Sequence, residues 1–283
     1  MIWLVLWFIA TLFGELNNSI TKEKTKNYHY MKVGVVTMTI SIIIYAIVAL
    51  YKYYSWTMTL NFAVASIPLL AVRLVLEIAQ TKITLLALKK CDRSTFSILR
   101  ILTIPLLVFV DIILGYNFTQ NSLIWIWIIL FAFFIFNTNT KTFDWKWWYY
   151  ALFTAVNAVA TISLFKYSIS HYWNSVEIDQ WIMRIWVLIF FLISNYKRDK
   201  LSGYEILKEE KIFYVQAIVI SISGLMLSYV YVYLNASEAT AVKRVWEMFW
   251  AIIAGAMFFN EKQVIKKLCF ATCIMIWMII MVL

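Results

Sequence analysis

The stretch EATAVKRVWEMFWAIIAGAMFFNEK, residues 238–262, is long and apolar enough for a membrane-spanning helix, yet Lys243, Arg244 and Glu247 lie near its middle. On membrane-insertion scales each charge at a helix centre costs about 2.5 to 3.5 kcal/mol, so three cost roughly 8 to 10 kcal/mol. Each strongly apolar side chain of the stretch returns only about 0.3 to 0.6 kcal/mol. We therefore expect this helix to turn its charges towards protein, water or a ligand.

The composition of the whole chain agrees with a membrane protein. Of the 283 residues 63% are hydrophobic and only 14% are charged, and the mean hydropathy is +0.79. Soluble domains carry about 25% charged residues. Apolar runs of about 17 to 25 residues, enough to cross a bilayer, can be placed ten times. The expected spans are 2–19, 31–51, 62–88, 94–115, 121–137, 147–166, 178–195, 212–234, 239–259 and 264–282.

The links between these spans are short, so no soluble catalytic domain fits among them. The longest, from Asn195 to Lys211, is strongly charged and is expected to be a surface loop. The cysteines form no CxxC pair, the two histidines have no metal-ligand spacing, and phosphate-binding and hydrolase motifs are absent from the sequence. The sequence therefore predicts no enzyme, no cofactor and no metal site, with the lipid bilayer and a small-molecule solute as partners.

Basic residues are concentrated in alternate links, so the net charge of +10 reports topology and not nucleic-acid binding. The links after the first, third, fifth, seventh and ninth spans hold most of the lysines and arginines. The other links hold little beyond Lys52 and Lys166. By the positive-inside rule both termini face away from the cytoplasm.

An internal repeat appears when the sequence is moved by 144 residues against itself. This shift sets residues 92–117 on 236–261 and pairs Arg100 with Arg244. It also superposes the first three spans on the sixth, seventh and eighth, and the fifth on the tenth. We expect two half-domains, 1–141 and 142–283, of five helices each. An odd number of helices inverts the second half. Chance similarity between apolar helices is the alternative.

Several ionisable and polar residues fall on helix faces that we expect to point inwards. In the third span Arg73, Glu77, Gln80 and Thr84 share one face, whose counterparts after the shift are the small residues Ala217, Ser221, Gly224 and Ser228. Further inward candidates are Glu15, Arg100, Asp111, Thr154, Asn157, Thr161 and Arg184. For Arg73 with Glu77 and for Lys243 with Glu247, simple neutralisation at i, i+4 spacing is the alternative. Trp246 and Trp250 flank Glu247, which leaves open an aromatic and acidic pocket for a cation.

The closing segment AxAVKRVWEMFWAIIAGAMFFNEKQVIKKLCFATCIMIWMII, residues 239–280, resembles the drug/metabolite transporter (DMT) superfamily, in particular its ten-helix EamA-type members. In that family a helix of small and polar residues is followed by a short turn with a glutamate, matched here by Asn260-Glu261-Lys262. Arg184 in DQWIMRIWVLIFF, residues 179–191, is similar to an arginine near the start of the family's seventh helix. The resemblance implies transport of amino acids, metabolites or drugs, with both termini in the cytoplasm. The loop lysines indicate the reverse orientation, and both remain open.

These patterns predict a secondary transporter of a small polar or charged metabolite, such as an amino acid, in the cytoplasmic membrane. The expected substrate-binding residues are Arg73, Arg100, Arg184, Lys243, Arg244, Glu247, Trp246, Trp250 and Asn157. The expected coupling or gating residues are Glu77, Glu247, Asp111 and Glu15, with Glu77 and Glu247 as candidates for carrying a coupling proton. Because only six Gly and two Pro are present, a non-transporting membrane module such as a receptor, scaffold or assembly partner is the alternative.

Overall fold

The computed structural model of the protein describes residues 2–24, 30–55, 61–116, 148–199, 211–259 and 264–282, together with Ile124, Ile128 and Phe131. All regular structure in these residues is helical. The helices are α1 (Ile2–Lys24), α2 (Tyr30–Tyr54), η1 (Val64–Ser66), α3 (Ile67–Lys90), α4 (Arg93–Leu99), η2 (Arg100–Leu102), α5 (Thr103–Ile113), α7 (Trp148–His171), α8 (Val176–Asp199), α10 (Lys211–Tyr233), α11 (Ala236–Phe259) and α12 (Val264–Val282).

Among the described residues, five helical segments are long and apolar enough to cross a membrane, which indicates a membrane protein. They are Gly34–Tyr54, Val64–Lys90, Ser94–Ile113, Trp148–His171 and Tyr214–Tyr233. The expected span at 121–137 lies outside the described residues, apart from the three isolated positions. Residues 195–199, the first of the expected loop, are helical, because α8 continues to Asp199.

Local sequence explains how several helices begin and end. Pro68 lies in the first turn of α3, where the missing N–H is tolerated, and Lys89 and Lys90 lie in its last turn, where a positive charge complements the helix dipole. The predicted single span at 94–115 is interrupted by the 3-10 turn η2 between α4 and α5. Pro105 has no N–H to donate to the carbonyl of Ile101, so a regular α-helix cannot pass through this point unchanged.

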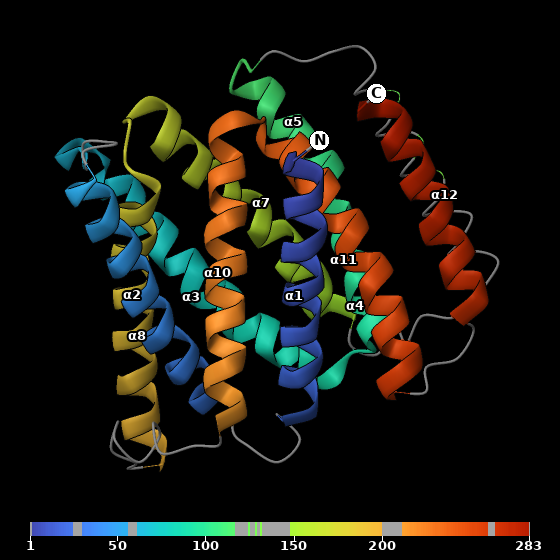
Figure 1. The fold of residues 1–283 in the computed structure, drawn as a ribbon, viewed down its shortest axis with the longest axis horizontal. Coiled ribbons are helices and arrows are strands. Elements are labelled where there is room, and N and C mark those ends of the chain that lie inside the picture. The colour runs from blue at the N-terminus through green and yellow to red at the C-terminus, as the bar shows by residue number, and fades with distance from the viewer. Residues whose placement is uncertain are drawn as a thin grey trace.

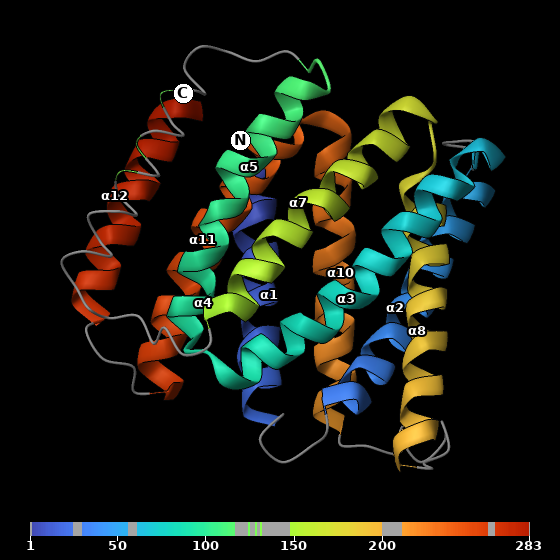
Figure 2. The same ribbon diagram turned by 180° about the vertical axis from the view of Figure 1, so that it is seen from behind.

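The helices form two layers. α1 and α10 lie side by side on the face seen in Figure 1, whereas α3 and α7 lie side by side on the opposite face, seen in Figure 2. α2 packs against α8 at one edge of the molecule, and α12 packs on α11 at the other. The two chain ends lie at the same end of the bundle (Figure 1). We call this the termini end, and the opposite end, where α1, α3, α8 and α11 finish, the lysine end.

When 144 is added to the residue numbers of the helices in the first half, their ends nearly coincide with those of the helices in the second half. α3 (67–90) becomes 211–234, against 211–233 for α10, and the rod from α4 to α5 (93–113) becomes 237–257, against 236–259 for α11. The same shift also relates the contacts between helices to one another. The contact of α1 with α10 corresponds to that of α7 with α3. The contacts of α2 with α8 and of the α4–α5 rod with α11 each correspond to themselves.

The small-residue face of α10 packs tightly against α2. The Oγ atoms of Ser41 and Ser221 lie 2.6 Å apart, and a Cβ placed on Gly224 would lie 3.2 Å from the hydroxyl oxygen of Tyr45. Small side chains permit this approach of the two backbones. In the second half this face therefore forms a close helix contact, whereas its counterpart on α3 carries charged and polar side chains.

Candidate functional site

A cavity of about 290 Å³ lies between the two layers. It is lined from α1 by Asn17, Asn18 and Thr21, from α2 by Gly34, Thr37 and Met38, from α3 by Gln80, Thr81, Thr84, Leu85 and Leu88, and from η2, α8 and α10 by Arg100, Arg184 and Ile220. These positions fall in the last turns of α1 and α3 and the first turns of α2, so the cavity lies towards the lysine end. Its volume is at the low end of the range for small-molecule sites.

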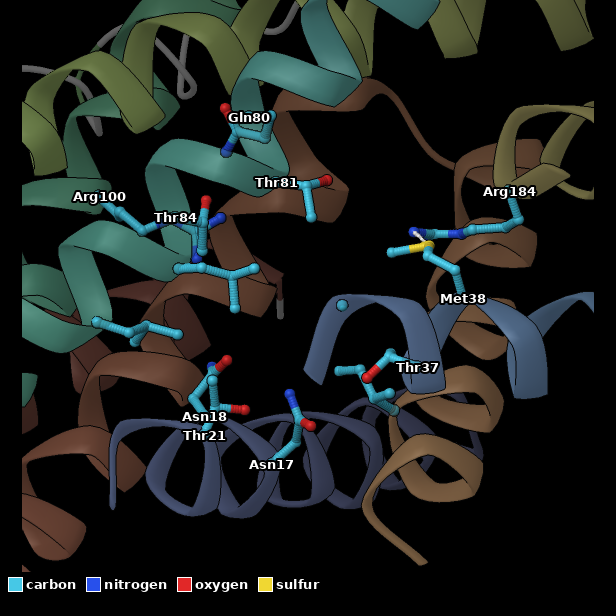
Figure 3. A pocket seen from close by; sticks show the side chains of 14 residues that line it. Asn17, Asn18, Thr21, Thr37, Met38, Gln80, Thr81, Thr84, Arg100 and Arg184 are labelled. Atoms are coloured by element: carbon cyan, nitrogen blue, oxygen red, sulfur yellow. Dashed lines mark hydrogen bonds between the residues drawn. The ribbon is translucent and has the colours of Figure 1, made fainter. Parts of the chain in front are cut away.

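The lining of the cavity is polar and positively charged. Arg100 and Arg184 lie on opposite sides of it, with Gln80, Thr81 and Thr84 on one wall and Asn17, Asn18 and Thr21 on the facing wall (Figure 3). None of the described lining residues is acidic. The walls therefore offer hydroxyl and amide groups between two guanidinium groups, which can donate to an anion.

Arg184 is held by weak partners. Its Nη1 donates to the sulfur of Met38 at 3.7 Å, and the thioether is a weak acceptor. Tyr45 lies beside the guanidinium group. The buried Nε atom makes no hydrogen bond, and no carboxylate of the described residues lies within 4 Å of this side chain. A charge within a membrane helix that has no carboxylate partner among the described residues is a candidate for binding a ligand.

The charges of α11 neutralise one another around Glu247. Arg244 Nη1 lies 2.5 Å from one carboxylate oxygen of Glu247, and Lys243 Nζ lies 3.9 Å from the other. Arg244 is 1% exposed, and its Nε donates to the hydroxyl of Thr103 at 3.2 Å. The hydroxyl of Thr103 in turn donates to the carbonyl of Arg100 at 2.7 Å. The three charges that make this helix unfavourable in lipid are therefore paired against η2 and α5.

Towards the termini end, buried ion pairs join neighbouring helices. Arg73 of α3 pairs with Asp179 of α8, each 1% exposed, and lies over the ring of Phe165 at 4.6 Å. Glu77 Oε1 is 3.8 Å from Arg73 Nε. Ser168 donates to Asp179 at 2.9 Å. This cluster joins α3, α7 and α8.

A second ion pair lies beside the first. Glu177 of α8 pairs with Lys52 of α2 and accepts a hydrogen bond from the hydroxyl of Tyr229 of α10. The ammonium group of Lys52 also lies 4.3 Å from the centre of the Tyr229 ring. Together the two pairs tie α2, α3, α7, α8 and α10 to one another at the termini end.

Sequence reasoning missed Asp179 and Glu177. Both carboxylates lie in the first turn of α8, where the helix dipole favours them. The signal that could have found them is two acidic residues at the start of a span, because basic residues in the other spans would otherwise lack counter-charges. The partner of Arg73 lies 106 residues away in sequence, however, and only the fold brings the two together.

Three other expected site residues make hydrogen bonds within or between helices. Asn157 donates 2.8 Å bonds to the carbonyl of Leu76 and to Gln80, which join α7 to α3. Asp111 is 1% exposed and accepts the backbone N–H of Ser237 at 2.9 Å, which caps the first turn of α11. Glu15 is buried in α1 and accepts a 3.4 Å bond from Ser19.

The structure thus brings some of the expected residues together and separates others. Arg100 and Arg184 line the cavity, whereas Arg73 with Glu77 and Arg244 with Lys243 and Glu247 form ion-paired clusters outside its lining. Trp246 and Trp250 pack against Phe249, with ring centres 6.2 and 5.5 Å apart, and are not among the lining residues. The expected turn at Asn260-Glu261-Lys262 lies outside the described residues.

No protein-family model matches this sequence and no curated protein matches it, so functional inference rests on the chain's own residues and geometry.

Proposed function

We propose that the protein is a secondary transporter that moves a small polar or charged metabolite, such as an amino acid, across the cytoplasmic membrane by alternating access. The observation that carries this proposal is the asymmetry of the bundle. A polar cavity lies towards the lysine end, whereas buried ion pairs join the helices towards the termini end. This is the arrangement expected of a carrier with its substrate site accessible from one side.

The proposal includes ten membrane helices arranged as two inverted repeats, 1–141 and 142–283. Its support is the agreement of helix ends under the 144-residue shift and the exchange of contacting helix pairs under the same shift. Alternation of direction along α1 to α5 and along α7 to α12 agrees with it (Figure 1). The proposal also includes an EamA-type relationship within the DMT superfamily, on the basis of the sequence of residues 239–280.

In this mechanism the cavity residues bind the substrate and the ion pairs act as a gate. Rocking of one repeat against the other would part Arg73 from Asp179 and Lys52 from Glu177, and would open the site towards the termini end. Glu77 lies between the gate and the cavity, because it is beside Arg73 and one turn before the lining residues Gln80 and Thr81. It is the first candidate for carrying a coupling proton, with Glu247 as the second.

Flux through the purified protein tests the proposal. The full chain is reconstituted into liposomes loaded with a panel of unlabelled amino acids and organic anions, and uptake of the labelled counterpart is measured. We expect accumulation of at least one solute by exchange, and its loss in Arg184→Gln. The matched control is Lys82→Gln, because Lys82 is an exposed cation of α3 that does not line the cavity.

Absence of exchange for every solute, with the protein folded in the liposomes, would reject transport and favour the alternative, a receptor, scaffold or assembly partner. In that case the ion pairs would serve stability alone. Equal flux in Arg184→Gln and in the unaltered protein would retain transport but remove the cavity as its site.

A further inference from the structure

Arg184 lines the cavity and has no carboxylate within 4 Å among the described residues. Its guanidinium group is positioned by the sulfur of Met38, which accepts from Nη1 at 3.7 Å, and by the neighbouring hydroxyl of Tyr45. Both partners are neutral, so they hold the group in place without cancelling its charge. The side chain is partly exposed, so a molecule in the cavity can reach it. The cavity therefore offers this guanidinium group to one anionic group.

The other arginine of the lining, Arg100, belongs to the charged cluster of α11. Its charge acts on Glu247, and its guanidinium group lies 5.3 Å from the centre of the Phe96 ring. The backbone carbonyl of Arg100 accepts from the hydroxyl of Thr103, which in turn accepts from Arg244. We therefore do not assign Arg100 to a ligand. A second anionic group in the cavity would have no guanidinium group of its own.

The remaining polar side chains of the lining are uncharged. Asn17 and Asn18 of α1 point into the cavity from the wall that faces Thr84 of α3 (Figure 3). The Oδ1 atom of Asn17 has no hydrogen-bond partner among the described residues, so this amide retains the capacity to bond another group. Amides and hydroxyls can bond a neutral polar group. An ammonium group or a second carboxylate among them would lose its water without gaining a counter-charge, which is unfavourable.

We infer that this cavity binds a monocarboxylate with an uncharged polar remainder, such as a hydroxy acid, with the carboxylate at Arg184 and the hydroxyl end among the amides of α1. This inference rests on the proposed function only in treating the cavity as the substrate site, and it favours hydroxy acids over amino acids within the proposed class of metabolites. Amino acids and dicarboxylates are disfavoured, because their second charge finds no partner in the lining. Phosphate monoesters are disfavoured for the same reason, since they carry nearly two negative charges at neutral pH.

Binding to the purified full chain in detergent tests the inference with acids that share one chain and differ only at the far end. The six-carbon series is 6-hydroxyhexanoate, hexanoate, 6-aminohexanoate and adipate, which end in a hydroxyl, a methyl, an ammonium and a carboxylate group. The four-carbon series is 4-hydroxybutyrate, butyrate, 4-aminobutyrate and succinate, and it spans a shorter distance from Arg184. A ligand that binds the folded state raises the apparent melting temperature, so titrations followed by tryptophan fluorescence yield the dissociation constants.

In at least one series we expect the hydroxy acid to bind at least about tenfold more tightly than the amino acid and the dicarboxylate, because each of these buries a second charge without a partner. The alkyl acid should bind about two- to tenfold more weakly than the hydroxy acid, as expected for the loss of one neutral hydrogen bond. Arg184→Gln should weaken binding of the hydroxy acid about ten- to a hundredfold. Lys82→Gln is the control and should leave all affinities unchanged.

The variant Asn17→Asp tests where the uncharged end lies. It places a carboxylate of nearly the same shape in a wall that has none among its described residues. The ratio of the affinities for the amino acid and the hydroxy acid should therefore rise about tenfold or more, because the ammonium group gains a counter-charge. An unchanged ratio would overturn the placement of the polar end at α1. Melting curves without ligand show whether each variant is folded.

An amino acid or a dicarboxylate that binds as tightly as the hydroxy acid in both series would overturn the inference. Failure of every acid to bind would do the same, and both results need only the unaltered protein. The expected preference for a hydroxy acid without exchange of any solute in liposomes would reject transport and retain the binding site. Exchange of an amino acid or a dicarboxylate without binding of either hydroxy acid would retain transport and reject the inference.

Discussion

Breaking the buried pair between Arg73 and Asp179 tests how much this pair stabilises the packing of α3 on α8. Both side chains are 1% exposed, so Asp179→Leu would leave a buried guanidinium without its main counter-charge. Removing one partner of such a pair costs about 3 to 5 kcal/mol. Glu77 already lies 3.8 Å from Arg73 and would compensate in part, so we expect a loss at the lower end, about 3 kcal/mol.

The paired variant Arg73→Met/Asp179→Leu should recover most of this loss. Removing both charges avoids the uncompensated cation, and apolar replacements of buried pairs are often neutral. Ser168 would lose the acceptor it has in Asp179, which costs about 1 kcal/mol. The double variant should therefore lie within about 2 kcal/mol of the unaltered protein.

Thermal unfolding in one detergent and at one scan rate, followed by tryptophan fluorescence, measures both variants. At about 2 to 4 °C per kcal/mol, Asp179→Leu should melt about 6 to 12 °C lower, and the double variant should regain most of that. A single variant as stable as the unaltered protein would show that the pair does not stabilise the folded state. A double variant less stable than the single one would refute the desolvation reasoning.

Three further predictions use the same melting assay. Gly34→Ala should cost about 1 to 3 kcal/mol, because the new Cβ would lie 2.9 Å from the ring of Phe191, whereas Gly14→Ala, with its nearest neighbour at 3.7 Å, is the control and should cost less than about 1 kcal/mol. Asp111→Ala removes the acceptor that caps α11 and should cost about 0.5 to 2 kcal/mol; no change would contradict the cap. Glu247→Gln leaves the two cations of α11 without their carboxylate and should lower the free energy of unfolding by about 2 to 3 kcal/mol. This loss is below the range for fully buried pairs because Glu247 is 13% exposed. Unchanged stability would mean that water already solvates the two cations.

The class of protein, a helical membrane protein, and the contacts within single helices could be predicted from the sequence alone. Apolar runs of bilayer length require helices, because only a helix satisfies every backbone group within one segment in lipid. The charges of α11 had to find partners for the same reason, and they do so through Glu247, three and four residues away on the same helix. Local spacing determines such contacts, so they can be read from the order of residues.

Only the tertiary structure decided which of the arginines within apolar helices line the cavity and which form ion pairs outside its lining. Arg73, Arg100, Arg184 and Arg244 look alike in sequence, since each is an arginine within an apolar helix. Their difference comes from helices far apart in the chain: α8 brings Asp179 to Arg73, whereas among the described residues Arg184 meets the sulfur of Met38 and the hydroxyl of Tyr45. A charge is available to a ligand only where the packing of distant helices places no carboxylate beside it, and no local pattern contains that information.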